Sequence, residues 1–268
     1  MKRISVSHII GTLFLFVCCI CSLLPIALGF ARSLFTDTAF TNFNYFSSYK
    51  EVIHTEQIPP AFLNSILIVI IAVPLNIVVV VMAAYGLSKF QFRGRNMIYL
   101  MLLSALMIPM ATVMYPCFVI MRNLGLLNSI FSVILAQVAY GIPMNLLMCK
   151  NYFDDIPNEM MEAARIDGAG TFRILKSVLV PLAKPVLLVI VLWGFLGSWN
   201  EYMWPLLFFL DSSKKTVTLL PQYFMSTYAQ QYDSLFAALF VIMVPTVVIY
   251  ICLQKYFEQG VVAGAIKQ

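Results

Sequence analysis

The chain has 268 residues and a net charge of +5; 61% of its residues are hydrophobic and only 11% are charged. Soluble domains are usually ~45–50% apolar and ~25% charged, so this composition excludes an ordinary water-soluble domain. The six cysteines all lie in apolar runs, the two histidines are far apart, and no nucleotide-binding or zinc-protease motif occurs. We therefore expect no enzyme activity, no bound cofactor and no metal site in this chain.

Six stretches are long enough to cross a ~30 Å hydrocarbon core, which takes ~20 predominantly apolar residues in a helix. In chain order they are Ile9–Phe30, Phe62–Leu87, Met97–Met121, Ile130–Met148, Pro185–Leu210 and Leu235–Leu253. The first is longer than the ~7–15 apolar residues of a signal peptide, so we interpret it as a retained signal-anchor helix. The sequence predicts an all-α, polytopic membrane protein with six transmembrane helices, formed as a single domain over residues 1–268.

Basic residues in the connecting segments predict the orientation. With the N-terminus in the cytoplasm, the inner segments hold 12 Lys and Arg residues and the outer segments hold 5, which accounts for all 17. Lys and Arg concentrate in the cytoplasmic loops of membrane proteins, so we expect both termini in the cytoplasm and an even number of spans. The net charge is then explained by contact with membrane lipid, and we expect no nucleic acid partner.

The longest predicted outer segment is Ala31–Ala61, which is rich in Phe, Tyr, Thr and Ser. Aromatic side chains favour burial over contact with bulk water, so we expect this segment to be ordered against the outer mouth of the bundle. Every predicted span contains proline, which removes a backbone hydrogen bond and tends to bend a helix. Either proline is simply common in spanning helices, or bent helices rearrange around a central path.

The longest predicted inner segment, residues 151–185, contains a short helix followed by a turn. Pro157 suits the first turn of a helix, and Gly168-Ala169-Gly170 ends it because glycine adopts the left-handed conformation that a helix stop requires. A second helix is predicted from Thr171 to Pro181. One face of the first helix is apolar and small, with members three and four residues apart: Met160, Ala163, Ala164 and Asp167.

A short helix at the cytoplasmic surface suits either a groove on a soluble partner or the surface of the lipid. Helices that lie on lipid usually carry bulky apolar residues and a polar face rich in Lys and Arg. In this helix Glu159, Glu162 and Asp167 are repelled by anionic headgroups. We therefore predict that the segment docks to a protein partner.

The same segment resembles the EAA loop of permeases from bacterial ATP-binding-cassette (ABC) importers. That loop has the pattern E-A-A, three residues, G, nine residues, then I-x-L-P, and the spacing here matches it throughout: Glu162-Ala163-Ala164, then Gly168, then Val178-Leu179-Val180-Pro181. The departures, valine for isoleucine and valine for leucine, are conservative in volume. The resemblance implies a coupling helix that sits in a cleft of the ATP-hydrolysing subunit. It assigns ATPase coupling to Glu162, Ala163, Ala164, Asp167, Gly168 and Ala169.

Further stretches resemble the carbohydrate-uptake branch of these permeases, the maltose type. They are Ala83–Phe90 with Arg93-Gly94-Arg95, Leu124–Asn128, Ile156-Pro157, Ala164–Ala169, Gly197–Leu206, and Gln254–Phe257 with Gly260 and Ala263–Ala265. Their order along the chain makes the resemblance far more specific than the loop alone.

The resemblance implies a bacterial inner-membrane importer in which this chain forms half of the translocation pathway. Its implied partners are a second, non-identical permease chain, a dimer of ATPase subunits and an extracytoplasmic solute-binding protein. ATP and Mg²⁺ are expected to bind to the partner ATPase, so this chain holds no cofactor. Movement of the ATPase is expected to reach the spanning helices through the coupling residues and to switch the bundle between two states.

A path for sugars needs polar groups and aromatic platforms inside the spans, where polar residues tend to face a cavity or the bundle interior. Our candidates are Tyr115, Tyr140, Asn145, Asn200 and Glu201. For Tyr140 and Asn145 hydrogen bonding between helices is an alternative role, and for Asn200 and Glu201 it is helix capping. For Trp199, Tyr202 and Trp204 we favour an interfacial aromatic belt.

Two other functions stay open at this stage. A permease of the same family could import a non-sugar solute such as a glycerol phosphodiester. An ion-coupled secondary transporter is less favoured, because it places ionisable groups near the midplane, whereas these spans hold essentially only Glu201 and show no inverted repeat.

Overall fold

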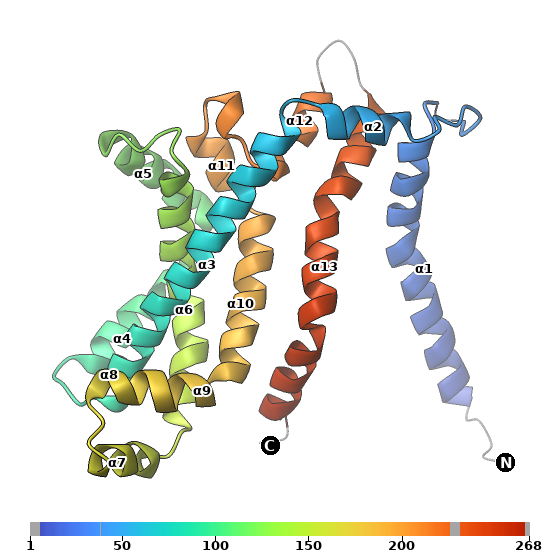
Figure 1. Ribbon diagram of the computed structural model, residues 1–268. Helices are drawn as coiled ribbons and strands as arrows, with labels where there is room; N and C mark the ends of the chain where they lie inside the picture. The colour runs from blue at the N-terminus through green and yellow to red at the C-terminus, as the bar shows by residue number, and fades with distance from the viewer. Residues whose placement is uncertain (1–5, 38, 226–230, 266–268) are drawn as a thin grey trace. The chain divides into compact units, whose positions relative to one another are not determined.

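The computed structural model describes residues 6–37, 39–225 and 231–265, and its regular elements in these ranges are helices (Figure 1). One isolated antiparallel bridge pairs Phe35 with Phe43. The expected all-α class is therefore confirmed for the described residues. Lys2, Arg3 and Lys267, which contribute to the predicted orientation, lie outside these ranges.

The chain forms two compact units, Met1–Ile58 with Leu220–Val244, and Pro59–Leu219 with Pro245–Gln268. The first unit contains α1 (Val6–Leu34), α2 (Ser47–His54), α12 (Pro221–Phe224) and the start of α13 (Tyr232–Ala265). A Cβ on Gly29 of α1 would lie 3.2 Å from the ring of Phe236, so glycine permits α1 to approach α13 closely at this point. The rings of Phe30 and Phe240 extend the contact at 5.3 Å.

The predicted outer segment is ordered, and it contains α2. Ser48 Oγ donates to Asp233 Oδ2 at 2.7 Å and Ser234 Oγ donates to Glu51 Oε2 at 2.7 Å, so two hydrogen bonds tie α2 to the start of α13. A chain of edge-to-face rings lies in the preceding loop, formed by Phe35, Phe40, Phe43, Tyr45 and Phe46. The Thr41 hydroxyl and the N–H groups of Asn42 and Thr41 donate to Asp37 in this loop and lower the pKa of its carboxyl group to about 2.

The second unit contains most of the remaining helices. They are α3 (Ile58–Lys89), α4 (Arg95–Ser104), η1 (Ala105–Met107), α5 (Met110–Asn123), α6 (Ile130–Asp154), α7 (Asn158–Ile166), α8 (Thr171–Ile174), η2 (Leu175–Leu179), α9 (Val180–Leu182), α10 (Lys184–Trp199), α11 (Met203–Phe208), η3 (Ser212–Lys214) and η4 (Val217–Leu219). Two buried clusters hold them together, and both contain residues of α3 and α6. Lipid is as apolar as these clusters, so close packing and interhelical hydrogen bonds stabilise the helix pairs.

Four helices are long and apolar enough to cross a membrane: Gly11–Leu34, Ile58–Lys89, Ile130–Asp154 and Tyr232–Cys252. Two bent helix pairs raise the number of candidate spans among the described residues to six if each pair counts as one. The long spans lie where the apolar runs predicted them.

The predicted span Met97–Met121 is not one continuous helix. Its two halves meet at 105° between Met107 and Met110, where Pro109 is extended with φ −61° and ψ 141°. Proline lacks the N–H that would continue the helix and disfavours helical backbone at the residue before it.

The predicted span Pro185–Leu210 is also shorter than expected. α10 ends at Trp199 and α11 begins at Met203, while α10 itself bends by 79° from the preceding segment Thr171–Leu182. The apolar run thus hides a break that lies close to Asn200 and Glu201.

Candidate functional site

The predicted cytoplasmic helix is α7, which projects from the second unit next to α8 (Figure 1). Pro157 lies at its N-cap position with φ −57° and ψ 138°, and Glu159 lies in its first turn. Proline before a helix loses no hydrogen bond, and a carboxylate near the N-terminus interacts favourably with the helix dipole. The helix thus begins at Asn158, one residue later than the predicted place of Pro157 in its first turn.

α7 ends in a Schellman motif. Gly168 has φ +78°, its N–H donates to Arg165 O at 3.0 Å, and the N–H of Ala169 donates to Ala164 O at 2.9 Å. These two bonds satisfy carbonyl groups that the end of a helix leaves free, and the left-handed conformation strongly favours glycine. The predicted role of Gly168 in stopping the helix is confirmed.

The side of α7 that faces the rest of the unit differs from the predicted small face. Met161, which we had not selected, is only 3% exposed and packs in the cluster that contains Tyr85 and Ile174. Ala164 is partly buried against the same cluster, three residues further along the same side. One member of the predicted small face, Ala164, therefore points inward, and the other three are exposed: Met160, Ala163 and Asp167.

The outer side of α7 is accessible. Glu162, Ala163, Asp167 and Gly168 are exposed, and Ala169 is partly buried. Three bulky apolar side chains at this end of the unit are exposed as well: Met160 at 42%, Ile166 at 86% and Phe172 at 70%. Exposed bulky apolar side chains are typical of a surface that contacts another protein or lipid.

The second helix of the loop is present but irregular. It runs from Thr171 to Leu182 and includes a π-helical turn at Leu175–Leu179. Leu179 is fully buried, so this turn packs against the core of the unit. Single π turns are common at functional sites in membrane and soluble helices.

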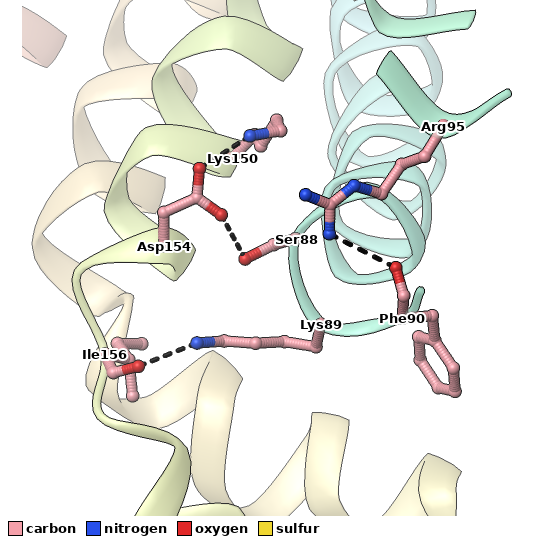
Figure 2. Close-up of polar contacts among 7 residues, drawn as sticks. All are labelled: Ser88, Lys89, Phe90, Arg95, Lys150, Asp154 and Ile156. Atoms are coloured by element: carbon pink, nitrogen blue, oxygen red, sulfur yellow. Dashed lines mark hydrogen bonds and ion pairs between the residues drawn. The ribbon is translucent and has the colours of Figure 1, made fainter. Parts of the chain in front are cut away.

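The last turn of α3 holds the loop through polar contacts (Figure 2). Lys89 Nζ donates to Ile156 O at 2.7 Å and to Asn158 Oδ1 at 3.2 Å. Ser88 Oγ donates to Asp154 Oδ1 at 2.6 Å, and Asp154 Oδ2 pairs with Lys150 at 2.6 Å. These contacts connect α3 with the end of α6 and with the first residue of α7.

Tyr85 adds a second contact on the same face of α3. Its hydroxyl donates to Thr171 O at 3.3 Å, and its ring is 5% exposed. We did not select Tyr85, Ser88 or Lys89 from the sequence. They lie three and four residues apart in a stretch that carries the family resemblance, and this spacing places them on one helix face.

A cavity of about 840 Å³ lies between α3, η1, α5, α6, α10 and α11. Its wall is mostly apolar, and its polar members are Asn76, Gln137, Tyr140, Asn145, Ser198 and Glu201. Glu201 is the only carboxylate among the 27 lining residues, and the lining contains no Lys, Arg or His. Both helix breaks border the cavity, through Ile108 and Glu201.

The structure brings some of the predicted passage residues together at this cavity. Tyr140, Asn145 and Glu201 line it. Tyr115 is 74% exposed and is not part of the wall. Asn200 is also outside the wall, and its Nδ2 donates to Leu196 O at 2.8 Å, which caps the end of α10.

Asn145 takes part in hydrogen bonding between helices. Its Nδ2 donates to Asn76 Oδ1 at 2.7 Å, and Asn76 Nδ2 donates to Val138 O at 3.0 Å. A Cβ on Gly141 would lie 3.1 Å from Asn76 Nδ2, so glycine permits α3 and α6 to meet here. Pro143 supplies no N–H to the same part of α6, and a side chain from a neighbouring helix supports such weakened turns.

The aromatic residues near the second break are core residues. Trp199 and Trp204 are both 2% exposed, so an interfacial belt is the wrong interpretation for these two side chains. Trp204 stacks on Phe208 with 5.6 Å between ring centroids. Glu201 Oε1 accepts hydrogen bonds from Met203 N at 2.8 Å and Trp204 N at 3.2 Å, which caps the short helix α11.

A family model described as "Binding-protein-dependent transport system inner membrane component" matches residues 76–263, more than half of the chain. The chain belongs to this family. The match covers α7, Gly168 and the cavity helices α6, α10 and α11. This binding-protein-dependent permease is thus a multi-pass protein of the inner membrane, and the family resemblance of residues 151–185 is confirmed.

Several similar proteins are permeases of sugar uptake systems. The permease is 33% identical over 224 residues to the diacetylchitobiose uptake permease of Streptomyces coelicolor, covering 83% of this chain and 74% of the relative. It is 34% identical over 205 residues to the maltodextrin transport permease of Bacillus subtilis, covering 76% and 74% of the two chains.

A solved structure supports the same relationship. The fold is similar to that of a chain in a crystal structure of a bacterial ABC transporter involved in the import of the acidic polysaccharide alginate. The TM-score is 0.84 at 26% identity, with 96% of this chain and 100% of the other covered.

Proposed function

We propose that this permease is one half of the translocation pathway of an ABC importer for a neutral sugar or oligosaccharide. In this proposal each bent helix pair forms one span, which gives six spans with both termini in the cytoplasm. Residues 1–268 act as one permease domain, and residues 151–185 form its coupling loop. The observation that carries the proposal is the exposed helix α7, braced on one side and ended by Gly168.

The coupling surface comprises Glu162, Ala163, Ala164, Asp167, Gly168 and Ala169. Exposure of Glu162, Ala163 and Asp167 supports direct contact with an ATPase subunit. Ala164 and Ala169 lie partly against the unit's own core, so they hold α7 at the correct distance from the bundle. The small side chains let the partner approach the helix backbone closely.

The assembly that we propose has a second, non-identical permease chain, two ATPase subunits and a solute-binding protein. The family description itself names dependence on a binding protein. The second permease chain enters the proposal from the resemblance to ABC importer permeases, which work as pairs. ATP and Mg²⁺ bind to the ATPase subunits, and this chain contributes movement rather than catalysis.

The composition of the cavity wall supports a neutral solute. An oligosaccharide presents hydroxyl groups and apolar ring faces, which suit a wall of apolar side chains interrupted by amides, a phenol and a hydroxyl. An anionic solute at ~5 Å from the Glu201 carboxylate would be repelled by about 3 kcal/mol at an effective dielectric of ~20, roughly a hundredfold in an equilibrium constant. A glycerol phosphodiester is therefore disfavoured.

The test is uptake by the intact importer. The complex is purified through a tag on this chain, reconstituted in liposomes with its binding protein, and supplied with ATP. We expect ATP-driven uptake of a neutral oligosaccharide and no uptake when ATP is omitted or when only an ion gradient is present. Uptake driven by an ion gradient without ATP, or ATP-driven uptake of a glycerol phosphodiester alone, refutes the proposal.

A further inference from the structure

The last turn of α3 touches the coupling loop on both sides of α7. We call this set of contacts the latch, and it consists of Tyr85, Ser88 and Lys89 on α3 with Asp154, Ile156, Asn158 and Thr171 on the loop and its flanks. On the N-terminal side Lys89 bonds to the turn before α7 and to its first residue. On the C-terminal side Tyr85 bonds to the first residue of α8.

The latch joins elements that the chain connects only indirectly. Ser88 and Asp154 are 66 residues apart, and Lys89 and Ile156 are 67 residues apart. Along the chain α7 continues directly from α6 and leads through α8 and α9 to α10. The latch adds α3 as a third helix that must follow any displacement of α7.

The chemistry of the Lys89 side chain suits it to join α3 to the loop. Its ammonium group has three donors, and two of them bond to the Ile156 carbonyl and the Asn158 amide oxygen. Hydrogen bonds that involve a charged group are stronger than neutral ones, and a cation at the C-terminal end of α3 interacts favourably with that helix's dipole.

Asp154 extends the latch to α6 and α4. Its two carboxylate oxygens take the Ser88 hydroxyl and the Lys150 ammonium, both at 2.6 Å (Figure 2). Lys150 Nζ also lies 4.6 Å from the centroid of the Tyr99 ring of α4. Beneath these polar contacts, Tyr85 and Met161 are buried in one cluster, so the latch also has an apolar base.

α3 carries the latch at one end and lines the cavity further along. Asn76, Val73 and Ala72 belong to the cavity wall, and Asn76 lies 13 residues before Lys89, or ~20 Å along the helix at ~1.5 Å per residue. A displacement of α7 that moves the end of α3 therefore moves the cavity wall as well.

We propose that Lys89 and Ser88 are positioning residues that transmit the displacement of α7 to α3 and so to the wall of the solute cavity. This inference rests on the proposed function as an ATP-driven importer. Neither residue contacts the ATPase or the solute in this account. Each acts by making the coupling helix and α3 move as one body.

The experiment measures uptake and ATP hydrolysis by the reconstituted importer in the same vesicles. The test variant is Lys89→Met, which keeps an apolar stem and removes the donors. The matched control is Arg95→Met, which removes a cation of the same cytoplasmic segment whose hydrogen bond, to Phe90 O at 3.3 Å, stays within that segment. Lys89→Arg serves as the rescue variant, and Ser88→Ala removes a single latch bond.

We expect Lys89→Met to lower the solute imported per ATP hydrolysed by at least about tenfold, as for loss of a hydrogen bond to a charged group, while ATP hydrolysis continues. Ser88→Ala lowers this ratio by a smaller factor, Lys89→Arg restores most of it, and Arg95→Met leaves it unchanged. An unchanged ratio in both Lys89→Met and Ser88→Ala overturns the latch. So does a parallel fall of uptake and hydrolysis with the amount of assembled complex, because that result indicates a structural role only. If the wild-type importer itself shows no ATP-driven uptake, the proposed function fails and the latch's role fails with it.

Discussion

Replacement of Gly168 tests the proposed coupling loop, because a side chain at this position disturbs only the backbone conformation. Gly168 has φ +78°, and an added Cβ would meet nothing within 4 Å. A steric clash therefore contributes nothing, and the cost of a side chain is the cost of left-handed backbone, about 1–2 kcal/mol for an ordinary L-residue. This cost lowers the ratio of the native turn to other backbone conformations by roughly 5- to 30-fold.

The order of effects among substitutions follows from their backbone preferences. Asn tolerates left-handed backbone, Ala tolerates it less well, and β-branched Val is a strong outlier there. We expect importer activity to be highest in the wild-type protein, lower in Gly168→Asn, lower again in Gly168→Ala and lowest in Gly168→Val. The two bonds that end α7, from Gly168 N to Arg165 O and from Ala169 N to Ala164 O, are lost in the same order.

Gly170→Ala is a matched control two residues away. Gly170 has φ −71°, which any L-residue adopts, and its Cβ position is also open. The assay measures ATP-driven uptake, the amount of ATPase that co-purifies, and the amount of the permease in the membrane. We expect Gly168→Val to insert normally but to lose uptake and ATPase binding, and Gly170→Ala to stay close to wild type. Equal uptake by Gly168→Val and Gly170→Ala would refute the argument.

Two further predictions concern the base of α7 and the charge in the cavity. Met161 is 3% exposed and Met160 is 42% exposed, so Met161→Ala should destabilise α7 by about 2–5 kcal/mol whereas Met160→Ala should change its stability little. The measurement is the protease sensitivity of the loop in the two variants. Equal sensitivity contradicts the assignment of Met161 to the buried side of α7. Glu201→Gln keeps the Oε1 acceptor that caps α11 and removes the only carboxylate of the cavity wall. Transport of a neutral oligosaccharide should therefore persist, and transport of an acidic oligosaccharide should increase. Competition between neutral and uronate-containing oligosaccharides measures this change, and an unaltered preference argues against the cavity as the path.

The helices and the main features of the loop were predictable because local rules decide them. Apolar runs require lipid, which placed the spans close to α1, α3, α6 and α13. Gly168 was recognisable as a helix stop because few residues other than glycine adopt its backbone conformation. The family resemblance was recognisable from the spacing of Glu162, Ala163, Ala164 and Gly168 together with the other stretches that resemble this family.

Predictions that depended on which neighbour a side chain meets were less successful. Met161 anchors α7, although its position in the sequence pattern did not single it out, because the position of α3 decides which side of that helix is covered. Trp204 is buried for the same kind of reason, since the break after Trp199 folds α11 back onto α5 and α6. Trp199 packs against the ring of Phe62 on α3. The one indication of this break in the apolar run across residues 185–210 was the alternative capping role of Asn200 and Glu201, which both side chains fulfil.

Composition, apolar run length and the loop pattern therefore determined by themselves that this protein is a helical inner-membrane permease with a short helix in the loop 151–185. These features depend on the solvent around each segment and on backbone conformation, which are local properties of the sequence. The tertiary structure alone decided that Tyr85, Ser88 and Lys89 contact the loop from α3. It also decided which of the predicted path residues line one cavity, namely Tyr140, Asn145 and Glu201. Those contacts join residues far apart along the chain, so only the packing of the helices brings them within reach.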